Sequence, residues 1–148
     1  MGNKIYIMII EQTKKYQKRI VYNPKTNTFC ESKYDSLFYA RSLIYPYGWI
    51  KESGTPPQPH WDVILISNDD YELGDEVEIN VIGVFIRNVG DHKYVAVTSK
   101  SKILDLFSLP KIEIDNLKRL YPKIDNGEGW FGHEMAEKCM IECVKSQL

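Results

Sequence analysis

The first two thirds of the chain consist of short apolar runs separated by turn-forming residues, a pattern typical of β-strands. Residues 5–10 form an apolar run rich in isoleucine, which predicts a strand buried on both faces. Residues 19–22 and 28–31 flank the turn-rich segment 23–27, and this arrangement predicts a β-hairpin.

Residues 76–87 carry the most informative strand pattern, because the side of the strand that is apolar changes partway along it. The apolar positions are first Val77, Ile79 and Val81, and then Ile82, Val84 and Ile86. A period of two cannot change phase without an extra residue, and Gly83 stands beside the slip. The pattern therefore predicts a β-bulge or sharp bend, as expected where a strand turns the corner of a barrel.

Two further strands are expected on either side of that segment, at residues 62–66 and 92–97. The proline-rich residues 54–60 precede the first of them and can form neither a helix nor a central strand, because proline lacks a backbone donor. A turn is expected at residues 88–91.

The last third of the chain changes to a helical period. A helix is expected to begin after Leu109-Pro110 and to continue through Leu117 and Leu120. A second helix is expected over residues 133–146, where apolar side chains form one stripe. That stripe comprises Met135, Ala136, Cys139, Met140, Cys143 and Val144. Strands followed by helices predict an α+β domain containing a small closed or partly closed barrel.

Composition narrows the possible function classes. The net charge is −1, from 19 basic and 20 acidic residues, so the basic excess usual for a nucleic-acid-binding domain is missing from the sequence. No apolar stretch is long enough to cross a bilayer. The three cysteines include no Cys-x-x-Cys pair, and this predicts reduced thiols in a cytoplasmic protein.

Several short strings follow one another in a recognisable order. They are residues 47–50 (Tyr-Gly-Trp-Ile), 62–65 (Asp-Val-Ile-Leu), 73–77 (Leu-Gly-Asp-Glu-Val), 82–84 (Ile-Gly-Val), 91–97 (Asp-His-Lys-Tyr-Val-Ala-Val), 109–110 (Leu-Pro) and 128–130 (Glu-Gly-Trp). Each is weak alone, but together they resemble the soluble, family I inorganic pyrophosphatases from about Ile5 to the C-terminus. The resemblance implies one domain over residues 1–148 and homo-oligomerisation. It also implies a five-stranded OB-like β-barrel with additional strands and C-terminal helices packed on it.

The chemistry of that family depends on clustered carboxylates. Pyrophosphate is shielded from nucleophiles by its own negative oxygens, so its hydrolysis needs several Mg²⁺ ions, which prefer oxygen ligands. The family provides ligands in an Asp-x-Asp-Pro-x-Asp loop, but here the first two aspartates are replaced by Pro57 and Pro59. Only Asp62 remains of the three.

The other family positions are partly retained. The later hairpin keeps Asp91 and Lys93, while its first aspartate falls at Asn88, and the signature Tyr47 is kept. The early glutamate aligns with Ile10 unless a one-residue shift brings in Glu11. At the family's Lys-x-Glu pair this chain has Arg19 and Val21, and at the family's next arginine it has Lys33. A Tyr-Lys pair near the C-terminus aligns with Ile124 and Asp125. Tyr121 and Lys123 could replace that pair only with a different local geometry.

The resemblance thus implies a set of candidate site residues. Asp62 and Asp91 are the candidate catalytic residues, and together with Glu11 they are the candidate ligands for Mg²⁺, if a metal is still bound. Arg19, Lys33, Tyr47 and Lys93 are the candidate residues for binding pyrophosphate or another phosphate-containing small molecule. The acidic run at residues 69–76 is expected to be a solvated loop, unless it folds back into the cavity.

Three functions stay open at this point. The first is a divergent relative with little or no hydrolysis, which keeps a phosphate- or metal-binding pocket or serves as an interaction module. The second is an active Mg²⁺- or Mn²⁺-dependent diphosphatase with a rearranged metal site. The third is a nucleic-acid-binding barrel, which the missing basic excess disfavours.

Overall fold

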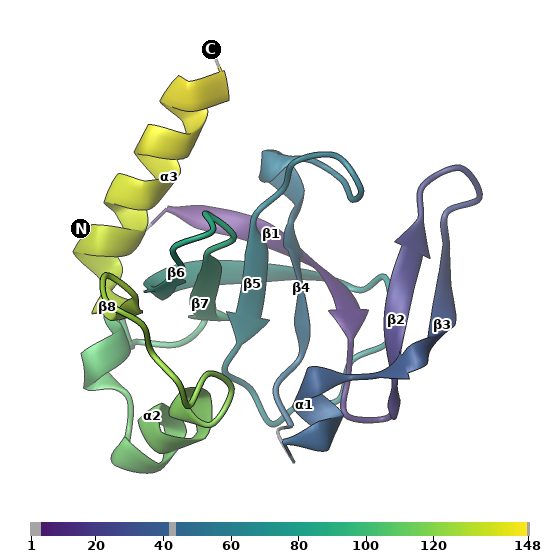
Figure 1. Cartoon of the computed structure of the whole chain (residues 1–148), viewed down its shortest axis with the longest axis horizontal. Helices are drawn as coiled ribbons and strands as arrows, with labels where there is room; N and C mark the ends of the chain where they lie inside the picture. The colour runs from purple at the N-terminus through teal and green to yellow at the C-terminus, as the bar shows by residue number, and fades with distance from the viewer. Residues whose placement is uncertain (1–3, 42–43, 148) are drawn as a thin grey trace.

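The computed structural model describes residues 4–41 and 44–147, and its centre is a closed β-barrel (Figure 1). The main sheet has the strand order β1-β4-β5-β7-β6-β8, and an additional pairing of β1 with β6 closes the first five strands into a ring. These strands are β1 (Ile5–Gln12), β4 (Tyr47–Ile50), β5 (Asp62–Leu65), β6 (Glu76–Ile86), β7 (Lys93–Thr98) and β8 (Gly129–Gly132). The α+β class and the five-stranded barrel expected from the sequence are confirmed.

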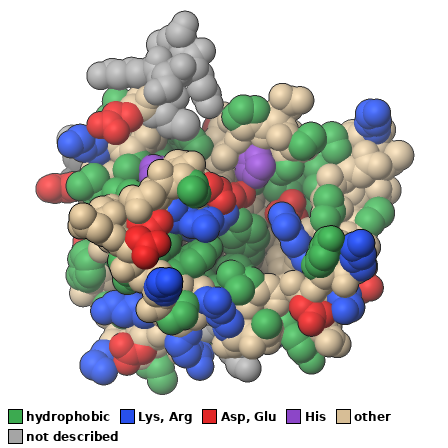
Figure 2. All heavy atoms as spheres, viewed as in Figure 1, with side chains coloured by type: hydrophobic (Ala, Val, Ile, Leu, Met, Phe, Trp, Pro, Cys, Tyr) green, Lys and Arg blue, Asp and Glu red, His purple; other side chains and the backbone are tan. Residues whose placement is uncertain are grey.

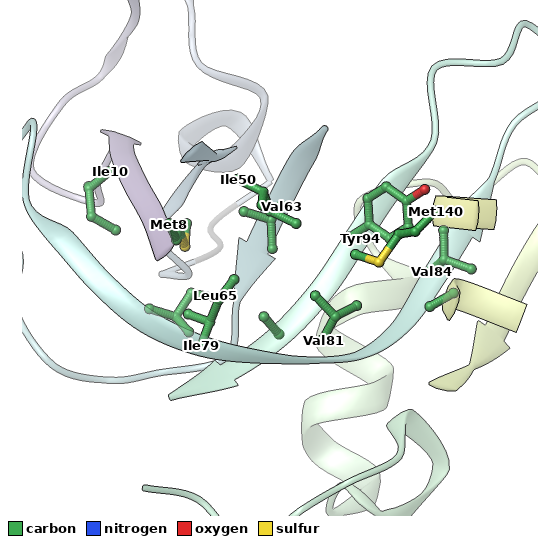
Figure 3. Packing of buried hydrophobic residues seen from close by; sticks show 12 residues of the cluster. Met8, Ile10, Ile50, Val63, Leu65, Ile79, Val81, Val84, Tyr94 and Met140 are labelled. Carbon is green, nitrogen blue, oxygen red and sulfur yellow. The ribbon is translucent and has the colours of Figure 1, made fainter. Parts of the chain in front are cut away.

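The barrel is filled by apolar side chains from all five of its strands and is covered at one end by a helix. Figure 3 shows this packing, with Met8 and Ile10 of β1 facing residues of β5, β6 and β7, and with Met140 of α3 (His133–Gln147) beside Tyr94. Of the predicted helical stripe, Ala136 and Met140 are buried. The side chains of Cys143 and Val144 lie outside the described part of the structure.

A second apolar cluster lies on the outside of the sheet. It joins β5 and β7 to η2 (Leu106–Ser108) and α2 (Lys111–Lys118). Leu117 and Leu120 are both fully buried in it, although the α-helix ends at Lys118. None of the helices formed by the described residues combines the length and the apolar character needed to span a bilayer.

The first strand differs from its prediction, because it is not buried on both faces. Met8 and Ile10 are completely buried, whereas Ile5 is 52% exposed and Ile7 and Ile9 are only half-buried. In a closed barrel alternate side chains point into the interior and outwards, so a continuous apolar run does not guarantee two buried faces.

The bulge predicted at Gly83 is confirmed. Along β6 the pairing with β7 runs from Val81 opposite Ala96 directly to Gly83 opposite Val95, so one extra residue is inserted. The slip divides β6 between two partners, with β1 paired before it and β8 paired after it. A Cβ atom at Gly83 would lie 2.7 Å from the carbonyl oxygen of Phe131, which explains the glycine.

The predicted hairpin is also confirmed and stands beside the barrel as a separate two-stranded sheet of β2 (Lys18–Asn23) and β3 (Thr28–Asp35) (Figure 1). Tyr22 and Phe29 pack together and contact Trp49 of β4, with ring centroids 5.1 Å apart between Tyr22 and Trp49. The short helix α1 (Leu37–Ala40) follows β3 and brings the chain back to the barrel. These contacts hold the hairpin over one edge of the barrel and leave a hollow between them.

Replacing Gly83 by alanine tests the close packing at the bulge. The added methyl group would meet the Phe131 backbone and, at 2.8 Å, the Cβ of Leu106, so Gly83→Ala should lower the free energy of unfolding by about 1–3 kcal/mol. Urea denaturation measures this loss. Val89→Ala, at a side chain that is 77% exposed in the following turn, is the control and should change stability by less than about 0.5 kcal/mol.

Candidate functional site

A pocket of about 380 Å³ lies between the hairpin, α1 and the barrel. Figure 2 shows a hollow near the middle of the molecule's face, with basic and acidic side chains at its rim and hydrophobic side chains inside it. The charged residues that line the pocket are Glu11, Arg19, Asp35, Arg87, Asp91 and Lys93, and its aromatic residues are Tyr34, Phe38, Tyr47 and Tyr121. The pocket therefore brings together side chains from segments far apart in the sequence.

The ammonium group of Lys93 is the best-satisfied charge in the pocket. It donates to the Tyr47 hydroxyl at 3.0 Å, to Asp62 Oδ2 at 2.7 Å and to Asp91 Oδ2 at 3.0 Å, although its residue is only 7% exposed. Because an ammonium group has three N–H donors, these contacts use all of them. Burial alone would lower the pKa of Lys93, but the charge and hydrogen bond of Asp62 outweigh it and raise the pKa.

The carboxylate of Asp62 is bonded on both of its oxygens. Oδ2 accepts from Lys93, and Oδ1 lies 2.9 Å from Nε2 of His60, while the side chain is only 13% exposed. Burial favours a raised pKa for Asp62, but the His60 hydrogen bond and the charge of Lys93 hold the pKa well below its ordinary value. The same hydrogen bond raises the pKa of His60.

Asp91 belongs to a second ion pair at the mouth of the pocket. Its Oδ2 accepts from Arg87 at 3.1 Å as well as from Lys93. The Arg87 guanidinium also lies 5.4 Å from the ring centroid of Tyr121, which stacks on Phe85 at 4.5 Å. Arg87 is thus held in place by two contacts, and within the described part of the chain only one of its guanidinium nitrogens donates a hydrogen bond, to Asp91.

Glu11 faces the pocket from the end of β1, at a residue where the strand pairing is irregular. The pairing with β4 shifts between Ile10, opposite Gly48, and Gln12, opposite Tyr47. Successive side chains of a strand point to opposite sides, so Ile10 is fully buried in the core while Glu11 lines the pocket. The pKa of Glu11 is raised to about 7, chiefly by burial and secondly by the negative charge of Asp62.

The structure brings most of the predicted site residues together. Glu11, Arg19, Tyr47, Asp91 and Lys93 line the pocket. Asp62 contacts Lys93 although it is outside the lining itself, and Lys33 lies apart with its ammonium 5.3 Å from the ring centroid of Tyr34.

Sequence reasoning missed several residues that the structure places here. His60 contacts Asp62, and Arg87, Asp35 and Tyr34 line the pocket, although none of the four was among the predicted site residues. Of the residues considered for the family's Tyr-Lys pair, Tyr121 lines the pocket, whereas Lys123 and Ile124 are not in its lining. Among these residues, the one with a signal in the sequence is Arg87, because it lies four residues before Asp91 across the predicted turn and could be expected to pair with it.

The acidic run at residues 69–76 stays outside this pocket. Among its residues Asp70, Glu72 and Glu76 form ion pairs with Lys14, Lys15 and Lys51 on the surface. Asp69, Asp75 and Glu76 line a separate surface groove. Residues 69–75 therefore form a solvated loop, as the composition indicated, and Glu76 begins β6.

The donors of the main pocket do not fit a cluster of Mg²⁺ ions. Both oxygens of Asp62 are engaged by protein cations, and Pro57 and Pro59 are exposed on the loop before β5 without offering any side-chain ligand. Within residues 4–41 and 44–147, no group of three or more His, Cys, Asp or Glu side chains is arranged to hold a metal ion.

Comparison with solved structures identifies the fold. An inorganic pyrophosphatase from Ehrlichia chaffeensis superposes with a TM-score of 0.74 and 22% identity, covering 96% of this chain and 94% of that one. The enzyme from Neisseria gonorrhoeae gives 0.73 and 22%, covering 96% and 90%, and that from Thermus thermophilus gives 0.67 and 17%, also covering 96% and 90%. No protein-family model and no curated protein sequence matches the chain. The chain therefore has the fold of the inorganic pyrophosphatases.

The raised pKa of Glu11 predicts a pH-dependent stability. In the unfolded chain this carboxyl titrates near its ordinary value of 4.5, whereas the folded protein holds the proton up to about pH 7. Between pH 4.5 and about pH 7 the folded state binds more protons than the unfolded state. The free energy of unfolding that protonated Glu11 contributes therefore falls as the pH rises through this range. Glutamine does not titrate, so Glu11→Gln lacks this loss. The stability of Glu11→Gln minus that of the wild type should therefore be about 1–3 kcal/mol larger at pH 8 than at pH 4.5.

Urea denaturation of both proteins at the two pH values measures this difference. Glu31→Gln, on an exposed position of β3, separates the effect of the Glu11 site from that of removing one negative charge. An equal stability difference between Glu11→Gln and the wild type at both pH values would contradict the prediction.

Proposed function

We propose that this chain is a divergent relative of the family I inorganic pyrophosphatases whose pocket binds phosphate-containing anions with little or no hydrolysis of pyrophosphate. The observation that carries the proposal is the state of the two retained carboxylates. Asp62 is bonded by Lys93 and His60, and Asp91 by Lys93 and Arg87, so protein cations stand where the family's chemistry calls for metal ions.

The loss of the neighbouring carboxylates supports the same conclusion. Two prolines replace the first two aspartates of the acidic loop, and Val21 replaces the glutamate of the Lys-x-Glu pair. A phosphoryl transition state that carries several negative charges needs several divalent ions for compensation. Asp62 and Asp91 are engaged by neighbouring basic side chains, and these two with Glu11 are too few to hold that number.

Anion binding is supported by the cations that face the pocket. Arg19 and Arg87 both line it, and guanidinium groups bind phosphate oxygens with two parallel hydrogen bonds. Lys93 adds positive charge, but its donors are already used within the protein. We therefore assign direct phosphate binding to the two arginines. Homo-oligomerisation remains a prediction from the resemblance.

A rearranged, active Mg²⁺ or Mn²⁺ site is the competing function, and Glu11 is the residue that favours it. Its carboxyl faces the pocket, and no hydrogen bond or ion pair of this side chain is found among the described residues. A working site would need Glu11, Asp62 and Asp91 to act together. Binding of the metal would have to displace His60 and Lys93 from Asp62.

A phosphate-release assay with pyrophosphate, run with Mg²⁺ and again with Mn²⁺, separates the two functions. We expect the wild type and Asp62→Asn to release phosphate at the same background rate, because the Asp62 carboxylate is not available to a metal. Rapid release by the wild type that Asp62→Asn abolishes would establish the active site instead.

Calorimetric titration with pyrophosphate in EDTA tests the binding half of the proposal. Arg87→Gln should weaken the affinity about tenfold or more, since hydrogen bonds to charged groups contribute about 1.5–3 kcal/mol. Lys25→Gln, in the exposed turn of the hairpin, is the control for loss of one positive charge and should leave the affinity unchanged. Failure of the wild type to bind pyrophosphate would refute the proposal.

A further inference from the structure

The pocket contains features that pyrophosphate cannot use. Two apolar side chains line it while staying accessible to solvent, namely Tyr34, which is 63% exposed, and Leu37, which is 39% exposed. Pyrophosphate has no apolar atoms and gains nothing from such a surface. A cavity of about 380 Å³ also falls within the range of clefts that hold organic ligands.

Arg87 and the apolar residues come from different parts of the pocket wall, whereas Arg19 shares the β2–β3 hairpin with Tyr34. Tyr34 and Leu37 belong to the end of β3 and to α1, whereas Arg87 follows β6 and is held by Asp91 and Tyr121. Arg19 lies on β2. A ligand that contacts both groups needs a phosphate at one end and a flat or apolar group at the other.

A carboxylate beside the apolar surface suggests that a sugar joins the phosphate to the flat group. Asp35 lines the pocket next to Tyr34 in sequence, and among the described residues only its Oδ1 has a partner, Lys18 at 2.8 Å. A carboxylate repels a bare anion but accepts hydrogen bonds from sugar hydroxyls, as acidic residues do for ribose in dinucleotide sites. Gln12, the neighbouring amide in the lining, is already occupied by the backbone at Tyr16, Lys18 and Ile20.

We propose that this pocket binds a nucleoside phosphate, with the phosphate on Arg19 and Arg87, the sugar hydroxyls on Asp35, and the base on Tyr34 and Leu37. The inference rests on the proposed anion pocket and adds its ligand class. Stacking of a base on an aromatic ring is tolerant of base identity, so the pocket selects nucleosides as a class.

Calorimetric titration of the full chain with ADP, ribose 5-phosphate and pyrophosphate, in EDTA and at constant ionic strength, tests the proposal. ADP and pyrophosphate share the diphosphate group, so their affinity ratio isolates the nucleoside. We expect ADP to bind about tenfold more tightly than pyrophosphate and than ribose 5-phosphate, because only ADP adds a stacked base.

Three tyrosine variants locate that difference. Tyr34→Ala should bring the ADP affinity down to the level of pyrophosphate, while Tyr34→Phe keeps the ring and should keep the tenfold ratio. Tyr39→Ala removes a ring that is 50% exposed on α1 but is outside the pocket lining, and it should leave all three affinities unchanged. Circular dichroism of each variant confirms that it is folded.

Asp35→Asn should change the affinities for pyrophosphate and ADP in opposite directions. Removal of the negative charge should strengthen pyrophosphate binding and weaken ADP binding, because only ADP has hydroxyl groups for this carboxylate. Equal affinities of ADP and pyrophosphate, unaffected by Tyr34→Ala, would overturn the nucleoside phosphate while leaving the anion pocket intact. Absence of binding by all three ligands would overturn both proposals.

Discussion

A positive charge buried at the edge of the barrel constrains the whole site. Lys93 begins β7 beside Asp62 of the parallel strand β5, and its ammonium needs partners because an unpaired buried charge is costly. Three different segments supply them, through Tyr47 of β4, Asp62 of β5 and Asp91 of the turn before β7. Removing one partner of a buried ion pair typically costs about 3–5 kcal/mol, so the Lys93–Asp62 pair fixes β7 against β5. The contacts with Tyr47 and the half-exposed Asp91 join β4 and the turn to the same point.

The same constraint governs the chemistry that the pocket can perform. Carboxylates that neutralise Lys93, His60 and Arg87 are not available to collect divalent metal ions, and the prolines in the loop before β5 offer no replacement. What remains is a pocket with two arginines, a carboxyl of raised pKa and exposed aromatic surface. Such a set of groups is the basis for our proposal that the pocket holds a ligand with a phosphate group.

Two irregularities in the strands position the site, and they differ in how visible they are in the sequence. The bulge beside Gly83 changes the phase of an alternating strand, so it could be predicted from the apolar pattern alone. The irregularity between Ile10 and Gln12 follows a continuous apolar run, in which no phase can be read. The choice between Ile10 and Glu11 as the pocket residue therefore depended on the pairing of β1 with β4.

The hairpin, the bulge at Gly83 and the two later helices follow from local pattern, because period and turn chemistry are properties of neighbouring residues. Strands β4 and β8 and the order of the strands in the sheet were not predicted from that pattern. Loss of the acidic loop was equally visible, since the proline side chain has no ligand atom at any geometry. The partners of Asp62, the entry of Glu11 and the meeting of Tyr34, Asp35 and Arg87 were decided only by the tertiary structure. These residues belong to segments far apart in sequence, and barrel closure together with hairpin docking brings them to one hollow.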